Sequence, residues 1–253
     1  MSNNLPLLHD SIVLTGTSIT RNAQSRIEAL GGSAIHLPLI ETVEINSPKD
    51  KQYLQQSQLA DWLIFTSQNA VYAFLHKMEQ YQMTAGDWTN QIAVVGKKTA
   101  DSLKEVGFDI DFIPTIFSAD VMVKEFNKLL TAKSNCLFIR GALAKNTIVE
   151  GLHCPVETWT IYETMPTTKS INQMRNVIQQ KRCTIVFASP SAVDVYVEAI
   201  LPDISWDSVD VAAIGHITYA ALQEVGATNI IQPSEYTMAA VIEEIAKRKE
   251  HKR

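Results

Sequence analysis

Short apolar runs alternate with longer amphipathic segments along almost the whole chain. The runs are brief, β-branched and continuously apolar, as expected of strands buried on both faces. They predict strands at residues 11–14, 34–37, 62–65, 92–95, 136–139, 184–187, 211–214 and 229–231. The amphipathic segments predict helices, most clearly at 21–30, 70–77, 99–106 and 218–225. The alternation indicates an α/β protein with parallel sheets flanked by helices.

The chain also contains two copies of one pattern. The segment FTSQNAV from Phe65 recurs 122 residues later as FASPSAV, and VGKKTADSL from Val95 recurs 119 residues later as IGHITYAAL. The second alignment holds its register as far as Ser118, which matches Thr237. A period near 120 residues has the size of a domain rather than of a solenoid repeat.

A weaker sequence similarity extends this repeat to the rest of each half. The strand that ends before Gly16 resembles the strand that ends at Arg140-Gly141, and the pair Glu41-Thr42 recurs 122 residues later as Glu163-Thr164. Each half then runs strand, helix, extended Glu-Thr segment, Ser loop, Gly loop and capped helix. We expect two similar domains, with the chain crossing between them at 38–45 and 158–166 and a ligand cleft between them.

Composition narrows the class of protein. The 253 residues are 46% hydrophobic, enough for two cores, and carry a net charge of −5. This charge argues against a nucleic acid partner, but an acidic protein can still hold an anionic small molecule in a locally positive site. Three dispersed cysteines, no apparent signal peptide and no apolar run of membrane-spanning length favour a cytoplasmic protein with reduced thiols and no membrane partner.

Hydroxyl and glycine loops are the candidate binding groups. Ser67 and Ser189 each follow a strand and precede a helix, where serine caps the helix and neighbouring amides form an anion site. Gly96 and Gly215 end strands in the same way, with Thr99 and Thr218 in the following helical turn. Tight turns and helix capping alone explain both patterns, but the carboxyl ends of parallel strands are also where such folds bind ligands.

The motifs of several enzyme classes are missing. The sequence has neither a dinucleotide fingerprint nor a P-loop, no nucleophile elbow, and no histidine or cysteine spacing that indicates a metal site. Tyr162, in the second extended segment, remains a candidate proton donor, although the residue type alone favours a half-buried structural tyrosine. The available groups suit binding and steering of a polyanion.

Taken in order, these segments resemble the uroporphyrinogen-III synthase family. The resemblance rests on Phe65-Thr66-Ser67, Val95-Gly96 with Thr99, Ile139-Arg140-Gly141, Ile161-Tyr162-Glu163-Thr164, Phe187 with Ser189, and Ile214-Gly215 with Thr218. It covers nearly the whole chain. One departure is Leu14-Thr15-Gly16-Thr17, where many members have Thr-Arg-Pro after the first strand; Arg21 is the nearest replacement for that arginine.

The resemblance implies a fold and a site. One α/β domain comprises 1–40 and 165–253, the other comprises 41–164, and a two-stranded connector joins them. Tyr162 becomes the catalytic residue that assists departure of the substrate hydroxyl. The implied substrate-binding residues are Thr66, Ser67, Gly96, Thr99, Arg140, Ser189, Gly215 and Thr218.

The resemblance also implies the reaction. Members close hydroxymethylbilane, a linear tetrapyrrole with eight carboxylates, to uroporphyrinogen III in haem biosynthesis. They lose water and invert ring D through a spiro intermediate, without a cofactor or metal. We expect a monomer, since no long exposed apolar seam is evident, and the upstream hydroxymethylbilane synthase is a candidate protein partner.

Two other functions remain open at this level. A non-catalytic protein could use the same cleft to bind or sense an anionic small molecule, and it would bind a linear tetrapyrrole without converting it. A nucleotide- or sugar-phosphate-binding enzyme is disfavoured by the missing phosphate fingerprint. Nucleotides would raise the melting temperature of such an enzyme.

Overall fold

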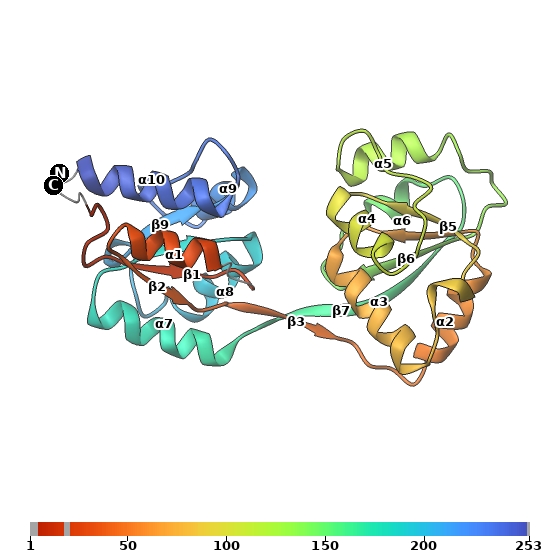
Figure 1. Cartoon of the computed structure of the whole chain (residues 1–253), viewed down its shortest axis with the longest axis horizontal. Helices are drawn as coiled ribbons and strands as arrows, with labels where there is room; N and C mark the ends of the chain where they lie inside the picture. Colours follow the sequence, from red (N-terminus) through yellow and green to blue (C-terminus); the bar gives the residue numbers. More distant parts are fainter. Residues whose placement is uncertain (1–4, 18–20, 252–253) are drawn as a thin grey trace. The chain divides into compact units, whose positions relative to one another are not determined.

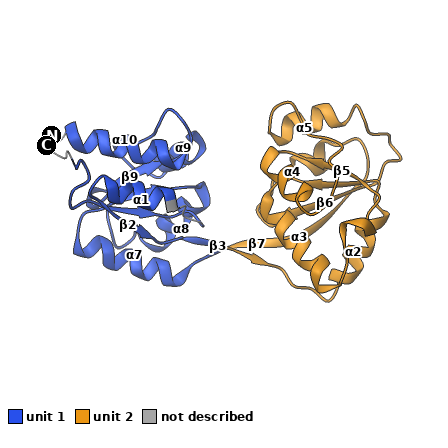
Figure 2. Cartoon of the chain, viewed as in Figure 1, with its two compact units in different colours: residues 1–41, 165–253 blue, residues 42–164 orange. Residues whose placement is uncertain are grey.

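The chain forms two compact units in a computed structural model that describes residues 5–17 and 21–251. Unit 1 contains residues 1–41 and 165–253, and unit 2 contains residues 42–164 (Figure 2). Unit 2 is therefore an insertion between two parts of unit 1. The domain division predicted from the sequence stays a prediction, because compactness alone does not show that each part folds independently.

The sheet of unit 1 has four parallel strands in the order β2-β1-β8-β9. They are β1 (Ser11–Leu14), β2 (Ser33–His36), β8 (Thr184–Phe187) and β9 (Asp210–Ala213). Helices α7 (Thr168–Gln180), α8 (Pro190–Ala199) and α9 (His216–Glu224) pack in one core with one face of the sheet. Helices α1 (Arg21–Ala29) and α10 (Met238–His251) pack in the core of the other face (Figure 1).

The sheet of unit 2 has the order β3-β7-β6-β4-β5. Its strands are β3 (Ile40–Glu44), β4 (Trp62–Phe65), β5 (Gln91–Val94), β6 (Cys136–Gly141) and β7 (Val156–Pro166). Helices α2 (Asp50–Leu59), α3 (Gln68–Gln80) and α4 (Lys97–Lys104) share one core, and α5 (Ala119–Phe126) and α6 (Thr147–Gly151) share the other. Short 3₁₀ turns lie at Ala85–Asp87 and Trp206–Ser208.

The two units repeat one sheet in a permuted order. Strands β7-β6-β4-β5 of unit 2 occupy the places of β2-β1-β8-β9 in unit 1, and β3 is added at the edge. Pairing is parallel throughout these four-stranded sets. The predicted α/β fold of two similar units with parallel sheets is confirmed.

Strands β3 and β7 carry the chain from one unit to the other. The boundary after Glu41 falls within β3, and the boundary before Met165 falls within β7. Hydrogen bonds run from Ile45 N to Ile161 O (2.9 Å) and from Thr167 N to Leu39 O (3.0 Å). Residue numbers rise along one strand as they fall along the other, so the connecting strands are antiparallel.

One predicted strand is wrong. Residues 229–231 form only an isolated bridge between Ile231 and Ala212, and Asn229 has a positive φ of 53°. A residue in the left-handed region breaks the extended backbone that a strand needs. The predicted glycine helix stops are present: Gly31 and Gly226, with φ of 87° and 80°, lie two residues after helix ends, and Gly107, with φ of 96°, lies three residues after the end of α4.

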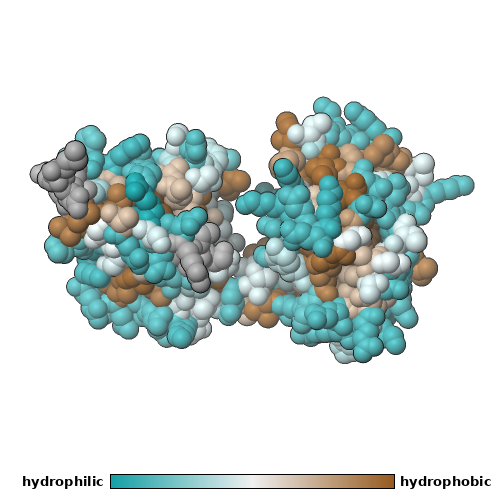
Figure 3. All heavy atoms as spheres, in the orientation of Figure 1, coloured by the Kyte–Doolittle hydropathy of each residue, from teal (hydrophilic) through white to brown (hydrophobic). Residues whose placement is uncertain are grey.

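The surface is mixed in character. Figure 3 shows hydrophobic patches separated by hydrophilic residues on the visible faces of both units. None of the helices in the described part of the chain has the length and apolar content needed to cross a membrane.

Candidate functional site

Within each unit, the predicted residues lie where the parallel strands end. We call this the carboxyl edge of the sheet, as distinct from its outer strands. Parallel strands place their carboxyl ends together. In unit 2, Ser67 follows β4, Gly96 follows β5 and Arg140 lies near the end of β6. In unit 1, Ser189 follows β8 and Gly215 follows β9. The edge in each unit therefore collects loops rich in hydroxyls and amides.

Ser67, Tyr162 and Gly141 form the centre of the unit 2 edge. The hydroxyls of Ser67 and Tyr162 are 3.1 Å apart and share a hydrogen bond. Ser67 Oγ also accepts from Ala70 N (3.2 Å), so it caps α3 while it contacts the tyrosine. A Cβ atom on Gly141 would lie 2.4 Å from Tyr162 Cζ. Only glycine therefore leaves room for the phenol ring in this position.

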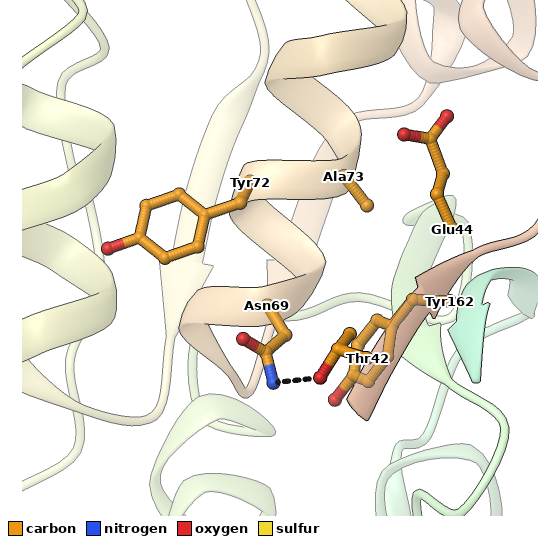
Figure 4. A pocket seen from close by; sticks show the side chains of 6 residues that line it. All are labelled: Thr42, Glu44, Asn69, Tyr72, Ala73 and Tyr162. Atoms are coloured by element: carbon orange, nitrogen blue, oxygen red, sulfur yellow. Dashed lines mark hydrogen bonds between the residues drawn. The ribbon is translucent and has the colours of Figure 1, made fainter. Parts of the chain in front are cut away.

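A pocket opens beside Tyr162, between β3, β7 and α3. It is lined by Thr42, Glu44, Asn69, Tyr72, Ala73 and Tyr162. Asn69 Nδ2 donates to Thr42 Oγ1 (3.2 Å), and both lie beside the Tyr162 ring, whereas the Tyr72 ring points away (Figure 4). The pocket thus presents a phenol, an alcohol and an amide to a ligand.

Glu44 joins this pocket to a buried cluster of charges. Its carboxylate oxygens contact Lys77 Nζ (2.8 Å) and His76 Nδ1 (2.5 Å). The Lys77 side chain is 0% exposed and also pairs with Asp50 (2.6 Å). A buried ammonium is tolerated only with such partners. The cluster therefore ties the end of β3 to the inner face of α3.

The Gly loop of unit 2 leaves a helix end open. Gly96 begins α4 without a side-chain cap, and the first backbone bond runs from Ala100 N to Gly96 O (3.0 Å). The amides of Lys97, Lys98 and Thr99 have no partner among the described residues. Thr99 is 5% exposed. The two exposed lysines add positive charge to an end that already favours anions.

Unit 1 repeats this arrangement. Ser189 Oγ accepts from Ala192 N (3.3 Å) and caps α8, whereas Gly215 begins α9 without a side-chain cap. Thr218 is 4% exposed. A second pocket brings Ser189, Gly215 and Thr218 together with Pro190, His216 and Tyr236. The structure therefore gathers all three predicted unit 1 residues around one hollow.

Arg140 is engaged elsewhere. Its Nη1 donates to Asn146 Oδ1 (3.1 Å), its Nη2 donates to Ala144 O, and its guanidinium lies over the Phe138 ring. Phe138 belongs to the core on the α5 and α6 side, whereas Tyr162 packs against the core on the other side of the sheet. Arg140 thus orders the loop after β6 and does not lie with Tyr162 in the pocket.

The first strand of unit 1 ends without an arginine. Thr15 Oγ1 donates to Val186 O (2.9 Å), and His36 Nε2 contacts Gly16 O (2.7 Å), so both side chains hold the backbone of this edge. Arg21 begins α1. The side chain of Arg21, the predicted substitute, lies outside the described residues.

Several pocket residues were not predicted as binding residues. Thr42 and Glu44 come from the connecting strand, Tyr72 from the first turns of α3, and Tyr236 from the loop before α10. The repeat could have indicated Tyr236, because it matches Phe117 at the offset of 119 residues. In the described part of the chain, no three His, Cys, Asp or Glu side chains are grouped as a metal site would need.

Together, the fold and the hydroxyl-lined edges define a class: an α/β protein of two like units that presents hydroxyls and free amides at its strand ends. Comparison with known proteins gives the family. The profile described as uroporphyrinogen-III synthase HemD matches residues 22–243. The chain belongs to the uroporphyrinogen-III synthase family, and the predicted resemblance is confirmed.

Curated relatives carry the same name. The chain is 28% identical to uroporphyrinogen-III synthase of Synechococcus elongatus over 94% of each chain. It is 32% identical to that of Chlorobaculum parvum over 65% of this chain and 70% of the relative. A match of 26% identity covers 79% of this chain but only 40% of the porphyrin biosynthesis protein HemD of Ruminiclostridium josui.

Solved structures support the fold. Uroporphyrinogen III synthase of Thermus thermophilus, as a mutant, matches with a TM-score of 0.67 and 16% identity, over 96% of this chain and 100% of that one. The enzyme of Helicobacter pylori matches with a TM-score of 0.64 and 18% identity, over 92% and 97%. The predicted enzyme class, a cyclising lyase of porphyrin and haem biosynthesis, is confirmed by the family and its named relatives.

Proposed function

We propose that this chain converts hydroxymethylbilane to uroporphyrinogen III, with Tyr162 as the group that assists departure of the substrate hydroxyl. The observation that carries this role is the hydrogen bond between Tyr162 and Ser67 at the mouth of a polar pocket. The bond orients the phenol at the edge where parallel sheets bind ligands. A phenol can donate a proton at neutral pH and recover it afterwards.

The first chemical step breaks one carbon–oxygen bond. The hydroxyl of the hydroxymethyl group leaves as water with a proton from the Tyr162 phenol, and the pyrrole nitrogen supplies the electron pair that turns the remaining methylene carbon into an azafulvene. Loss of the pyrrole N–H proton returns a proton to the phenolate, so the charge balances. Because this ionisation is intrinsically easy, the tyrosine accelerates the step but is not indispensable.

The remaining steps depend on positioning. The substituted carbon of ring D attacks the azafulvene carbon and gives a spiro intermediate. One bond of that intermediate breaks, the ring turns over, and reclosure with loss of a ring proton gives isomer III. Each step is intramolecular, so the protein's main contribution is to hold the flexible chain in the reactive conformation.

We assign substrate binding to the hydroxyls and amides of both edges. In unit 2 these are Thr66, Ser67, Gly96 and Thr99, and in unit 1 they are Ser189, Gly215 and Thr218. The open first turns of α4 and α9 support this assignment, because uncapped helix amides attract carboxylates. Arg140 acts indirectly in this scheme, by ordering the loop that follows Gly141.

The cellular setting follows from the chemistry. We propose that the enzyme works in the cytoplasm as a monomer and receives its unstable substrate from the upstream hydroxymethylbilane synthase. Three free cysteines support a reducing compartment. Neither a nucleic acid nor a membrane is needed for this reaction.

A coupled assay tests the proposed function. Hydroxymethylbilane is generated in place by its synthase, the protein is added, and the oxidised porphyrins are separated by chromatography. We expect isomer III to predominate, and the same mixture without the protein supplies the control for spontaneous closure. If isomer I alone forms at the spontaneous rate, the proposed function is wrong.

A further inference from the structure

The hollow in unit 1 combines groups that suit one particular kind of ligand. We define the Tyr236 hollow by Ser189, Pro190, Gly215, His216, Thr218 and Tyr236. It lies at the carboxyl edge of the sheet, where α8 and α9 begin. The proposed function uses the hydroxyls of this edge but gives no role to the aromatic side chains.

The two helices that begin at the hollow differ in whether their first backbone amides have hydrogen-bond partners. Ser189 caps α8, and Pro190 has no amide hydrogen to leave unpaired. Helix α9 begins at Gly215, which offers no cap, and its first bond runs from Tyr219 N to Gly215 O (3.0 Å). The three amides before Tyr219 find no partner in the described part of the chain. Helix α9 thus presents an open anion site.

Thr218 gives independent evidence for a ligand. Its side chain lines the hollow, is only 4% exposed, and makes no hydrogen bond with the described residues. Thr218 Oγ1 is not fully enclosed by the protein, so this hydroxyl is open to a partner in the hollow. A ligand acceptor in the hollow would satisfy it together with the α9 amides.

Tyr236 supplies an apolar surface beside this anion site. Its side chain is 55% exposed, and its ring centroid lies 5.2 Å from that of His216. A half-exposed aromatic ring against a pocket offers a flat face for another ring. His216 keeps Tyr236 beside the helix end and adds a hydrogen-bonding group of its own.

Unit 2 contains the same set of groups. At the offset of 119 residues, Gly96, Lys97, Thr99 and Phe117 match Gly215, His216, Thr218 and Tyr236. Helix α4 is likewise uncapped, Thr99 is 5% exposed, and Phe117 is 61% exposed. A Cβ on Gly215 would lie 3.9 Å from Tyr236 Cγ, whereas a Cβ on Gly96 would meet nothing within 4 Å, so unit 2 matches unit 1 in sequence and the aromatic contact is seen at the Tyr236 hollow. A sequence pattern of glycine, threonine and an aromatic residue in each unit suits a ligand built from repeated rings that bear carboxylates.

We propose that the Tyr236 hollow binds one pyrrole ring of the linear tetrapyrrole, with the ring against Tyr236 and one carboxylate at the α9 amides and the Thr218 hydroxyl. The inference deepens the proposed function and rests on it. It makes Tyr236 a binding residue for the ring face, so that its aromatic ring matters and its hydroxyl does not.

Kinetics on the full chain test the ring contact. Tyr236→Ala should raise KM for hydroxymethylbilane about three- to tenfold, the worth of one aromatic contact, and leave kcat within about twofold. Tyr236→Phe should keep KM near the wild-type value because it retains the ring. Tyr81→Ala, which removes a tyrosine that is 38% exposed at the end of α3, is the matched control.

A second pair of variants tests the carboxylate contact. Thr218→Val keeps the shape but removes the hydroxyl and should raise KM about fivefold to tenfold, whereas Thr218→Ser should restore it. Melting temperatures of all variants are measured alongside. If Tyr236→Ala melts more than about 5 °C below wild type, Tyr236→Leu, which keeps apolar bulk but no ring, replaces it with the same expected rise in KM.

The outcomes separate the inference from the proposed function. Isomer III from the wild type, with raised KM in Tyr236→Ala or its Leu replacement and in Thr218→Val, supports both. Isomer III from the wild type with KM unchanged in folded Tyr236 variants overturns the ring contact and leaves the proposed function standing. Isomer I alone from the wild type overturns both.

Discussion

At the scale of single residues, Tyr162 depends on two neighbours. Ser67 holds its hydroxyl through a 3.1 Å hydrogen bond, and Gly141 leaves space for its ring. The serine also caps α3, so the same side chain begins a helix and orients the phenol. Substitutions around Tyr162 therefore separate proton transfer from positioning.

The first prediction concerns the phenol itself. Tyr162→Phe should lower kcat about tenfold to hundredfold, since it removes one proton donor from a reaction that proceeds slowly without it. Formation of isomer III is measured in the coupled assay. Tyr53→Phe, which removes the hydroxyl of a ring stacked on Trp159, is the control and should retain wild-type activity. Full activity in Tyr162→Phe would rule out the proton-donor role.

The second prediction concerns the glycine under the ring. Gly141→Ala should displace Tyr162, because its Cβ would lie 2.4 Å from Tyr162 Cζ. We expect a loss of activity at least as large as that of Tyr162→Phe, with a stability loss of about 1–3 kcal/mol from overpacking. Gly86→Ala is the control, since its Cβ would meet only Thr84 Oγ1 at 3.7 Å. An active Gly141→Ala enzyme would contradict the assigned ring position.

At the scale of secondary-structure elements, the charged cluster joins β3 to α3 and α2. Lys77 on α3 lies between Glu44 at the end of β3 and Asp50 at the start of α2. The lysine is fully buried, whereas His76 is 56% exposed at the rim. The cluster therefore holds the strand that carries Thr42 against the helix that carries Asn69.

The third prediction removes the central charge. Lys77→Met should destabilise the protein by about 3–5 kcal/mol, because Asp50 would stay buried without its cation and Glu44 would keep only its contact with His76. Urea unfolding monitored by tryptophan fluorescence measures this loss. Lys51→Met, on an exposed position of α2, should change stability by less than about 0.5 kcal/mol. Equal effects of the two substitutions would show that the buried pairs contribute little.

Asp210 links β9 to α10 in unit 1. Partial burial alone would raise the pKa of its carboxyl, but hydrogen bonds from Arg182 and Lys249 outweigh burial and lower the pKa to about 2. The contacts are 2.9 Å to each cation. A carboxyl with a lowered folded-state pKa stabilises the protein above its unfolded-state pKa and loses that contribution as pH falls.

The fourth prediction follows from that sign. Asp210→Asn should lower the free energy of unfolding by about 1 kcal/mol at pH 6. This figure is smaller than the pKa shift alone would give, because solvent screens a half-buried carboxyl. The difference from wild type should shrink as pH falls from about 4 towards 2, where the wild-type carboxyl becomes protonated. Denaturant unfolding at pH 6 and pH 3 measures it. A difference that stays constant across this range would contradict the proposed linkage.

At the scale of the whole molecule, the sequence predicts most of the architecture because local and global signals agree. Buried runs such as Trp62–Phe65 and Thr184–Phe187 become central strands with the predicted bounds. The repeat predicts two like units, although the permuted strand order becomes visible only in the sheets. The strand predicted at residues 229–231 is wrong because apolar character indicates burial. It gives no information about the left-handed backbone at Asn229, which interrupts a strand.

Some residues of the candidate site could likewise be predicted from the sequence, and others could not. Ser67, Ser189, Gly96 and Gly215 follow from strand–loop–helix patterns, and the structure places them at the expected edges. The contacts of Arg140 could not be predicted from the sequence. Alternation along β6 puts Arg140 on the same face as Phe138, but only the structure shows which face this is and that the guanidinium lies over the Phe138 ring. Thr42 and Glu44 reach the pocket through long-range pairing of β3, which no local pattern encodes.

The insertion of unit 2 within unit 1 has a consequence for synthesis on the ribosome. Strand β1 is made before unit 2, but its partner β8 begins only at Thr184. The apolar residues of β1 therefore lack this partner strand until all of unit 2 has been synthesised. Unit 2 is contiguous, and domains generally fold as units while the chain emerges. We expect stalled nascent chains that expose residues up to about 180 to protect 42–164 from protease but not 5–41. Chaperone binding should therefore concentrate on β1, although it is made before unit 2.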